Sequence, residues 1–301
     1  MAYTSVDDPT IYFNTVLYTG NGSTQTITGV GFQPDWVWIK NRSGAQGHSL
    51  YDVVRGFTTG TVLNTADNGA EATSEGNGLN GIDSDGFDLS GNNTVVGGTN
   101  ASSQTYVAWN WAMGTSFSND ASATSVGSID SSGSINTTAG QSIISWTGTG
   151  SAGTIAHGLS AVPRMIIVKN RDQNDSWYVY HVANGNTHSI LLDTNGAKVG
   201  AYTDNWNNTT PTSSVFSVGG AHATSGASNE KMISYCFADV KGYSRISSYV
   251  GNADTDGPFV YCGFRPAWFL VKNTAASEHW RVYDNKRNTF NHMFRLLNPN
   301  E

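Results

Sequence analysis

The stretch QPDWVWIKNRSGAQGHSLY, residues 33–51, decides the fold, because equivalent stretches occur twice more in the chain. Counted from Pro34, Pro163 and Pro266, a Lys-Asn pair begins six residues later and a Tyr stands seventeen residues later. The aligned positions are Lys40-Asn41, Lys169-Asn170 and Lys272-Asn273; His48, Trp177 and Trp280; Leu50, Val179 and Val282; and Tyr51, Tyr180 and Tyr283. Chance does not align three segments without a gap, so the chain is predicted to repeat one structural unit.

The similarity extends outward from these stretches. Residues 16–20, 143–148 and 246–251 correspond before them, residues 63–65 and 192–194 correspond after them, and residues 107–112 pair with residues 233–238. The third copy starts near Ser244 and reaches Glu301 with half a unit missing, so we expect either a fragment or a copy completed by another element. The predicted organisation is a first unit at residues 1–115, a linker plus second unit at 116–242, and a partial third unit at 243–301.

Each unit is predicted to be built of strands. The run after each anchor proline is apolar at consecutive positions, which is typical of a strand covered on both faces. The residues expected to be buried for this reason are Trp38, Ile39, Ile167, Val168, Phe269 and Leu270. Asn-Gly and Asp-Gly turns separate the strands, and no window sustains a helical period. The fold class is therefore all-β, as tandem antiparallel β-sandwich repeats of the jelly-roll or concanavalin-like kind, with the third repeat incomplete.

Composition excludes several classes of protein. Charged residues make up 13% of the chain and the net charge is −7, so nucleic acid is not an expected partner. No apolar stretch reaches the length of a membrane span, and the opening MAYTSVDDPT lacks the basic start and apolar run of a signal peptide. We expect no membrane insertion and no export by the standard route. Cys236 and Cys262 lie in apolar runs and are predicted to be buried, reduced thiols.

The stretch between Ser116 and Gln141 is rich in Ser, Gly, Thr and Asn. Its first part, to about Ala123, is predicted to be a linker. The remainder spaces Val126, Ile129 and Ile135 among polar residues, which favours an edge hairpin of the second unit.

The Lys-Asn pair is the one polar feature present in all three copies. One hypothesis makes Lys40, Lys169 and Lys272 contacts to a ligand such as an acidic glycan. The favoured hypothesis is structural, with a long side chain at the end of a buried strand followed by a turn-forming Asn. The lysine could also pair with Asp52 or Asp284, although the second unit has His181 at that position.

Aromatic residues in polar surroundings are the other candidate ligand contacts. Trp206 lies in the polar stretch TDNWNNTT, and Trp109 and Trp111 share one face of a predicted strand. Rings flanked by Asn and Asp are typical of sugar-binding surfaces, because the ring packs on C–H groups while amides bind hydroxyls. The alternative for Trp206 is a plug that packs within its own loop.

The sequence contains no pattern typical of catalysis or of a metal site. It has no GxSxG elbow, no HExxH, no paired-cysteine zinc spacing and no phosphate-binding loop. Residues 83–86 resemble the start of a calcium loop but lack the downstream Glu, so a turn into the strand at Phe87 is favoured. Carboxylate pairs for glycoside cleavage depend on distances in space and stay open. We predict a protein that is not an enzyme and carries no cofactor or metal.

Several long segments resemble an uncharacterised tandem-repeat virion protein family of marine tailed phages, including cyanophages. The segments are DDPTIYFNTVLYTGNGSTQTIT (7–28), QPDWVWIKNR (33–42), VAWNWAMG (107–114), HGLSAVPRMIIVKNR (157–171), TPTSSVFSVGG (210–220), CFADVKGYS (236–244) and WRVYDNKRN (280–288). In that family the third copy continues beyond the segment that matches RLLNPNE, which favours truncation here.

The resemblance implies a structural component of a tailed-phage virion, expected to be tail- or fibre-associated and to be assembled in the host cytoplasm. The implied partners are other virion proteins and further copies of the chain. The alternatives are a receptor- or glycan-binding module that contacts a host surface glycan, a capsid decoration protein, and, least favoured, a polysaccharide depolymerase. Recognition is expected on three variable loops in the same slot of each unit, residues 43–47, 172–176 and 274–278, presented by units in line.

Overall fold

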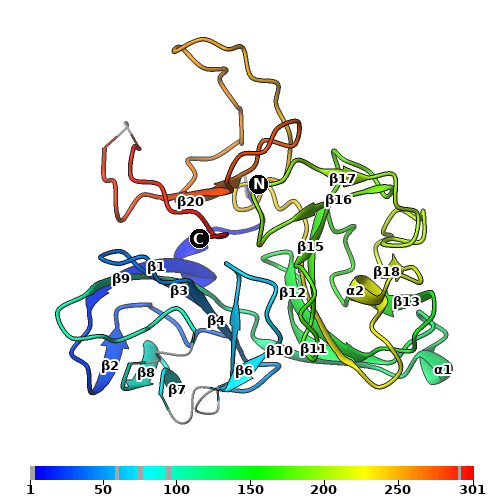
Figure 1. Ribbon diagram of the computed structural model, residues 1–301, viewed down its shortest axis with the longest axis horizontal. Helices are drawn as coiled ribbons and strands as arrows, with labels where there is room; N and C mark the ends of the chain where they lie inside the picture. The colour runs from blue at the N-terminus through cyan, green and yellow to red at the C-terminus, as the bar shows by residue number, and fades with distance from the viewer. Residues whose placement is uncertain (1–3, 58–60, 74–76, 93–95, 291–292) are drawn as a thin grey trace.

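The computed structural model describes residues 4–57, 61–73, 77–92, 96–290 and 293–301. Apart from two four-residue α-helices and one 3-10 turn, the regular elements of these residues are strands, so the all-β prediction is confirmed. Figure 1 shows three groups of strands around a common centre. We call them the first unit (strands within residues 13–111), the second unit (strands within 115–237) and the third unit (residues 244–301).

The first unit has two antiparallel sheets. A six-stranded sheet has the order β1-β9-β3-β4-β5-β6 and a three-stranded sheet has the order β2-β8-β7. The bounds are β1 Phe13–Thr19, β2 Thr24–Thr28, β3 Trp36–Asn41, β4 His48–Asp52, β5 Thr61–Asn64, β6 Ala72–Thr73, β7 Leu79–Asp83, β8 Gly86–Ser90 and β9 Thr105–Trp111. The β7–β8 hairpin turns at Ser84 and Asp85, as predicted, and the Asp85 carboxylate accepts backbone N–H groups of Gly29 and Gly31 at 3.1 and 2.6 Å.

The second unit repeats this plan. An eight-stranded sheet has the order β10-β11-β12-β19-β14-β15-β16-β17, and β13 pairs with β18. The bounds are β10 Thr115–Asn119, α1 Ala121–Thr124, β11 Ser131–Asn136, β12 Gln141–Thr147, β13 Gly153–Ala156, β14 Met165–Asn170, β15 Tyr178–His181, β16 His188–Leu191, β17 Val199–Gly200, β18 Val215–Val218, α2 His222–Ser225 and β19 Lys231–Phe237. The predicted linker is wrong, because residues 115–124 form β10 and α1. Polar Ser and Thr side chains suit an exposed edge strand, and Asp120 caps the helix through the Ala123 N–H.

The two units match at the level of strand register. In each, the strand after the anchor proline lies between the strand of the Tyr position and the strand of residues 105–111 or 231–237. The matching pairs are Trp36↔Trp111 and Asn41↔Tyr106 in the first unit, and Met165↔Phe237 and Asn170↔Met232 in the second. Both Lys-Asn segments therefore end the same strand of the same sheet.

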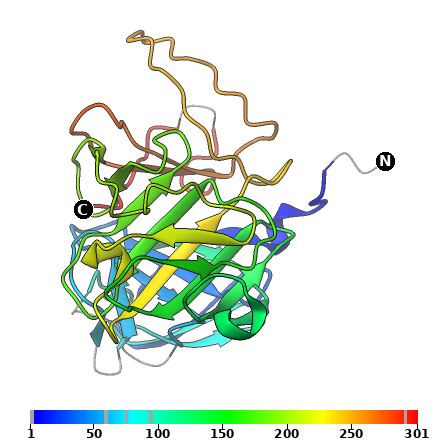
Figure 2. The same cartoon turned by 90° about the vertical axis from the view of Figure 1, so that its right-hand side faces the viewer.

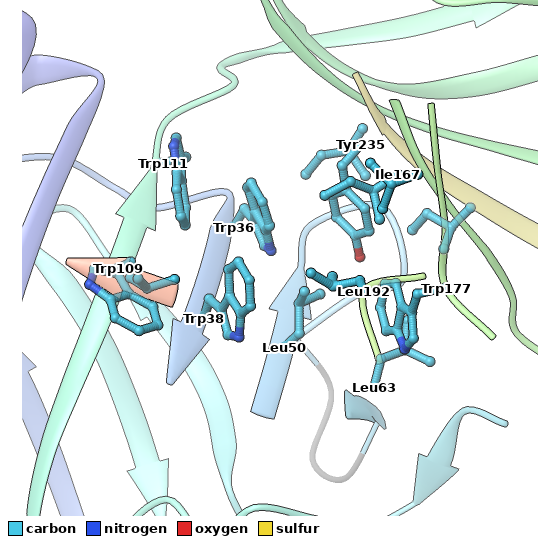
Figure 3. Close-up of a cluster of buried hydrophobic side chains, with 14 of the residues drawn as sticks. Trp36, Trp38, Leu50, Leu63, Trp109, Trp111, Ile167, Trp177, Leu192 and Tyr235 are labelled. Atoms are coloured by element: carbon cyan, nitrogen blue, oxygen red, sulfur yellow. The ribbon is translucent and has the colours of Figure 1, made fainter. Parts of the chain in front are cut away.

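Each large sheet is buried on both faces. Outward side chains such as Val37 and Ile166 pack against the smaller sheet of their own unit, which forms an outer core in each unit. Inward side chains from all three units form one central core, and Figure 3 shows Trp36, Trp38 and Trp109 facing Tyr235 and Trp177 across it. Trp36 stacks on Tyr235 with ring centroids 4.8 Å apart. The units therefore share a core and are not strung in line.

Among its described residues, the third unit contains two strands, β20 (Trp268–Val271) and β21 (Arg281–Asp284), which pair with each other. Residues 245–267 form a loop that projects from the body, as Figures 1 and 2 show. The predicted burial of Trp38, Ile39, Ile167 and Val168 is confirmed. It is wrong for Phe269, which is 37% exposed, because no second sheet among the described residues covers the outward face of β20. It is also wrong for Leu270, which faces the central core but is half-buried, because among the described strands β20 has a neighbour on one side alone.

The two cysteines differ for the same reason. Both are free thiols. Cys236 lies buried in β19, and burial raises its pKa to about 12. Cys262 lies outside any strand and is only partly buried, so the prediction of a buried thiol is wrong there.

Candidate functional site: the junctions between the units

The three repeated lysines lie where two units meet. Lys169 Nζ donates to the carbonyl oxygen of Asn68 in the first unit at 3.1 Å, and Lys272 Nζ donates to that of Asn195 in the second unit at 3.2 Å. Lys40 Nζ donates to the backbone carbonyl of Glu301 in the third unit at 2.9 Å. The second unit thus contacts the first, the third contacts the second, and the first contacts the third. These contacts close a ring around the central core.

Each lysine also holds the variable loop of its own unit. Lys169 Nζ donates to the carbonyl oxygens of Gln173 and Asp175 at 3.0 and 2.7 Å. Lys40 and Lys272 donate in the same way to Gln46 and Ala276. The long side chain thus ends a strand and satisfies carbonyls of the loop that follows it. This arrangement is the favoured structural hypothesis, extended by a contact to the neighbouring unit.

The asparagine of the pair forms the expected turn in all three units. Its side-chain oxygen accepts the backbone N–H two residues later at 2.8 Å in Ser43, 3.0 Å in Asp172 and 2.9 Å in Ala275. Such a bond fixes the chain direction at the strand end. The predicted pairing of the lysines with Asp52 or Asp284 is wrong, since both carboxylates pair with arginines.

A second ring of contacts comes from the position fourteen residues after each anchor proline. Trp177 Nε1 donates to the Asn64 carbonyl in the first unit at 2.9 Å, and Trp280 Nε1 donates to the Leu191 carbonyl in the second at 2.8 Å. In the first unit the residue is His48, whose Nε2 lies 3.0 Å from the Asn298 carbonyl in the third unit. This ring has the same direction as the lysine ring.

A third set of contacts involves two buried aspartates. Asp52 binds Arg55 Nε at 2.6 Å and Asp284 binds Arg287 Nε at 2.5 Å, within the repeated pattern Asp-x-x-Arg. Each carboxylate also accepts a bond from the adjacent unit. Tyr235 Oη donates to Asp52 at 2.7 Å, and Trp109 Nε1 donates to Asp284 at 3.1 Å.

Tyr235 and Trp109 occupy the same position in their units, two residues before the last residue of β19 and of β9. The third such contact would run from the third unit to the second, at His181. Within the described residues of 244–301 there is no counterpart of β9 or β19, and His181 remains half-buried. The ring of acid contacts therefore has two members where the other two rings have three.

Several side chains at the junctions are buried, and burial shifts their pKa values. Burial lowers the pKa of Lys169 to about 8, against the opposing attraction of Asp175. Burial also lowers the pKa of Lys40 to about 8, with Glu301 opposing it. Burial holds the pKa of His48 well below its usual value, so the ring is neutral and donates from Nε2 to Asn298. At pH 7 the two lysines stay largely protonated and donate their N–H groups to backbone carbonyl oxygens, while the neutral His48 ring donates to one.

The variable loops also contribute to the junctions. The Asn174 side-chain oxygen accepts the Ala70 N–H of the first unit at 2.9 Å, and the Thr274 carbonyl accepts the Lys198 N–H of the second at 3.0 Å. Two of the three loops expected to carry recognition are thus partly occupied within the chain. Between the first and second units, Glu71 links Arg55 and Arg171 at 3.0 and 2.7 Å.

The aromatic candidates lie inside the protein. Trp206 is 1% exposed, its Nε1 donates to Ser189 Oγ at 2.9 Å, and its ring contacts Tyr180 edge-on at 5.7 Å. It belongs to the outer core of the second unit, so its interpretation as a sugar-binding surface residue is wrong. The alternative of a plug within its own loop falls short as well, because the ring packs on a strand. Trp109 and Trp111 share one face as predicted, and that face is buried in the central core.

Among the described residues, no group of three or more His, Cys, Asp or Glu side chains could hold a metal ion. One titratable cluster lies on the surface of the second unit, where His222 contacts Asp175 at 2.8 Å and Glu230 at 3.0 Å. Partial burial would lower the pKa of His222, but the bonds and charges of Asp175 and Glu230 raise it. None of the described helices is long and apolar enough to cross a membrane.

Comparison with known proteins shows the family of the chain. A family model described as domain of unknown function (DUF7483) matches residues 8–301, and the chain belongs to this family. No curated protein matches the chain. No solved structure matches it either.

Sequence analysis found the lysines, but it named Asp52 and Asp284 only as partners for those lysines and missed their arginine partners. The Asp-x-x-Arg spacing stands at residues 52–55 and again at 284–287, and its recurrence was the signal that could have found them. No pattern in the sequence could show that each repeated donor reaches the neighbouring unit, since that depends on how the units pack.

Proposed function

We propose that the protein is a structural component of a tailed-phage virion, tail- or fibre-associated, that assembles through its β-sandwich units and loops. The proposal is supported by the contacts that the repeated polar side chains make. The lysines, the ring N–H groups and the aspartates bind neighbouring units of the same chain. Repetition in this chain therefore serves construction, because the recurring chemistry is used to hold three units together.

The proposal assigns no catalytic role to the chain and places it among virion proteins and further copies of itself. The candidate sugar contacts are Trp206, Trp109 and Trp111, whose rings are buried, and the three repeated lysines, which bind backbone carbonyl oxygens of neighbouring units. The remaining surface candidates for recognition are those parts of the three variable loops (residues 43–47, 172–176 and 274–278) that do not contact a neighbouring unit.

The test is the location of the protein in intact particles. Mass spectrometry of purified virions should find the chain at a fixed copy number, and gold-labelled antibodies should mark the tail or its fibres under the electron microscope. Absence of the chain from purified particles would contradict the proposal. A polysaccharide panel with reducing-end detection should show no cleavage, and release of reducing ends would point to a depolymerase.

A further inference from the structure

The two links between successive units differ in length and in structure. Residues 112–140 join β9 to β12, whereas residues 238–245 join β19 to the segment 246–251, which corresponds to part of β12. The longer link folds into the β10–β11 hairpin with α1 between its strands, and Figure 1 shows α1 at the end of the second unit away from the first. A hairpin is not required to join two units, because the shorter link joins them without one.

The hairpin takes no part in the rings of contacts that hold the units together. None of the donors or acceptors of those rings lies within residues 115–136. Its outward side chains serve its own unit instead. Phe117 and Ile135 pack against the outer core of the second unit, and Ser131 Oγ donates to the Ala156 carbonyl at 3.0 Å. The opposite face of the hairpin is free for another role.

That opposite face carries a row of hydroxyls in register. Ser118 of β10 lies beside Ser132 of β11, and Ser132 lies beside Ser145 of β12. Ser118 and Ser132 are exposed and Ser145 is half-buried, and none of the three hydroxyls has a hydrogen-bond partner among the described residues. The row spans about 10 Å, because neighbouring strands lie about 5 Å apart. In β1 of the first unit Leu17 occupies the place of Ser145, so the fold does not require a hydroxyl there.

An open hollow of about 300 Å³ lies over this row. Asn119, Ser131 and Trp146 also border it, but side chains alternate along a strand, and Trp146 packs into the outer core on the other side of the sheet. The side chains that line the hollow on its own face are all polar: Ser118, Ser132, Ser145, Thr147, Asp120 and Asp130.

Each aspartate holds α1 with one carboxylate oxygen and leaves the other free. Asp120 Oδ1 accepts the Ser122 hydroxyl at 2.7 Å and the Ala123 N–H at 3.0 Å, and Asp130 Oδ1 accepts the Ala121 N–H at 2.8 Å. Neither Oδ2 atom has a hydrogen-bond partner among the described residues. The bonds from Ser122 and Ala123 lower the pKa of Asp120, so this carboxylate is charged at neutral pH. The hollow therefore presents charged acceptors beside hydroxyls.

We propose that this hollow binds a neutral saccharide of one or two sugar rings. Sugar hydroxyls donate to the free Oδ2 atoms of Asp120 and Asp130 in charge-assisted hydrogen bonds. The serine hydroxyls both donate to and accept from the sugar, and their row is as long as a disaccharide. Acidic sugars bind more weakly, because the two carboxylates repel them.

The polar lining favours a sugar over a protein partner. The centre of a protein interface is apolar, and the one apolar residue that borders the hollow, Trp146, is 4% exposed. No ring is exposed for stacking, so the affinity depends on hydrogen bonds and the Kd of a single hollow is expected to be about millimolar. Several copies of the chain in one assembly raise the apparent affinity through multivalency. The inference goes beyond the proposed assembly role and does not depend on it.

The test is a titration of the isotope-labelled full chain followed by NMR. Maltose, cellobiose, lactose and mannobiose are the neutral probes, and glucuronic acid is the acidic one. At least one neutral sugar should shift the backbone amide signals of residues 118, 132 and 145 with a Kd of about 0.1–10 mM. Glucuronic acid should bind at least about tenfold more weakly. If no neutral sugar shifts these signals at about 20 mM, or if glucuronic acid binds equally well, the proposal is overturned.

Two serines of β10 provide a matched pair of variants. Ser116 and Ser118 are both exposed on the same face of the strand, but Ser118 lines the hollow and Ser116 does not. Ser118→Val should weaken sugar binding at least about fivefold, while Ser116→Val should match the parent chain. Equal affinities of the two variants would place the sugar elsewhere and overturn the proposal.

A second variant tests the carboxylates. Asp120→Asn combined with Asp130→Asn keeps side-chain oxygens that cap α1, because Asn caps helices about as well as Asp. Loss of both charges should weaken sugar binding at least about tenfold, with Tm measured to show that the fold is retained. A folded double variant with the affinity of the parent chain would contradict the proposed contacts.

Discussion

The second and third units place the same residues in different surroundings. Ile166 and Phe269 occupy equivalent outward positions of β14 and β20, yet Ile166 is fully buried and Phe269 is 37% exposed. Lys169 is fully buried, whereas Lys272 is half-buried. The sequences of the two stretches are equally apolar. The difference comes from β19, which pairs with β14, and from β18, which pairs with β13 in the smaller sheet of the second unit.

At one position the third unit is more buried than the second, and the reason is again the presence or absence of a covering strand. Asp284 in the third unit is 1% exposed, because Trp109 of the complete first unit reaches it. His181 at the equivalent place in the second unit is half-buried, because the described residues of the third unit contain no strand that would face it. Burial of a position in this protein therefore depends on whether the adjoining unit has a strand of the β9 kind.

The largest expected effect is a difference in the free energy of unfolding between variants at this position. Asp284→Ala leaves the Arg287 guanidinium buried without its partner and should lower the free energy of unfolding by about 3–5 kcal/mol. The matched variant His181→Ala should cost less than about 1 kcal/mol. Urea unfolding of both variants measures the difference, and equal losses would show that position in the ring does not govern burial.

A second comparison is made on the inward face. Ile167→Ala in β14 removes a buried side chain from the central core and should cost about 2–5 kcal/mol. Leu270→Ala at the equivalent place in β20 should cost about 1 kcal/mol, since Leu270 is only half-buried. A cost for Ile167→Ala below about 1 kcal/mol would mean that β14 is not a central strand.

The lysine contacts should differ in the same direction. Lys169→Met leaves the carbonyl oxygens of Asn68, Gln173 and Asp175 without their donor and should cost about 1–3 kcal/mol. For Lys272→Met water can reach the freed carbonyls, so the loss should stay below about 1 kcal/mol. Thermal unfolding at pH 7 tests the pair. Identical shifts in Tm would place both lysines in the same environment.

The smallest expected effect is a titration. His222 follows β18 and contacts Asp175, whose counterpart in the third unit, Glu278, contacts Arg281 instead. Because the pKa of His222 is raised in the folded protein, its contribution to stability is complete below the unfolded pKa of about 6.5 and is lost as pH rises through the folded value. Proton NMR should show the His222 midpoint above about 6.5, and Asp175→Asn should lower it. A midpoint that does not respond to Asp175→Asn would contradict the contact.

The sequence was sufficient to predict strands, repeats and most of the buried runs. The alternation and the Lys-Asn turns are local properties, and they predicted β3 and β14 correctly. Phe269 and Cys262 were placed wrongly because the same local pattern stands in the third unit without the strands that cover it. Trp206 was placed wrongly because its polar neighbours in sequence are not its neighbours in space. The rings of contacts needed the packing of whole units, which no single segment encodes.

The central claim is that the three units close around one shared core through equivalent contacts, and the bond from Tyr235 to Asp52 tests it most directly. These residues lie in different units and are 2.7 Å apart at their oxygens. A double-mutant cycle with Tyr235→Phe and Asp52→Asn should give a coupling energy of at least about 1 kcal/mol. The control cycle of Tyr235→Phe with Asp88→Asn, a carboxylate that binds Thr26 on the outer sheet, should be additive within about 0.5 kcal/mol. Additivity in the first cycle would contradict the shared core.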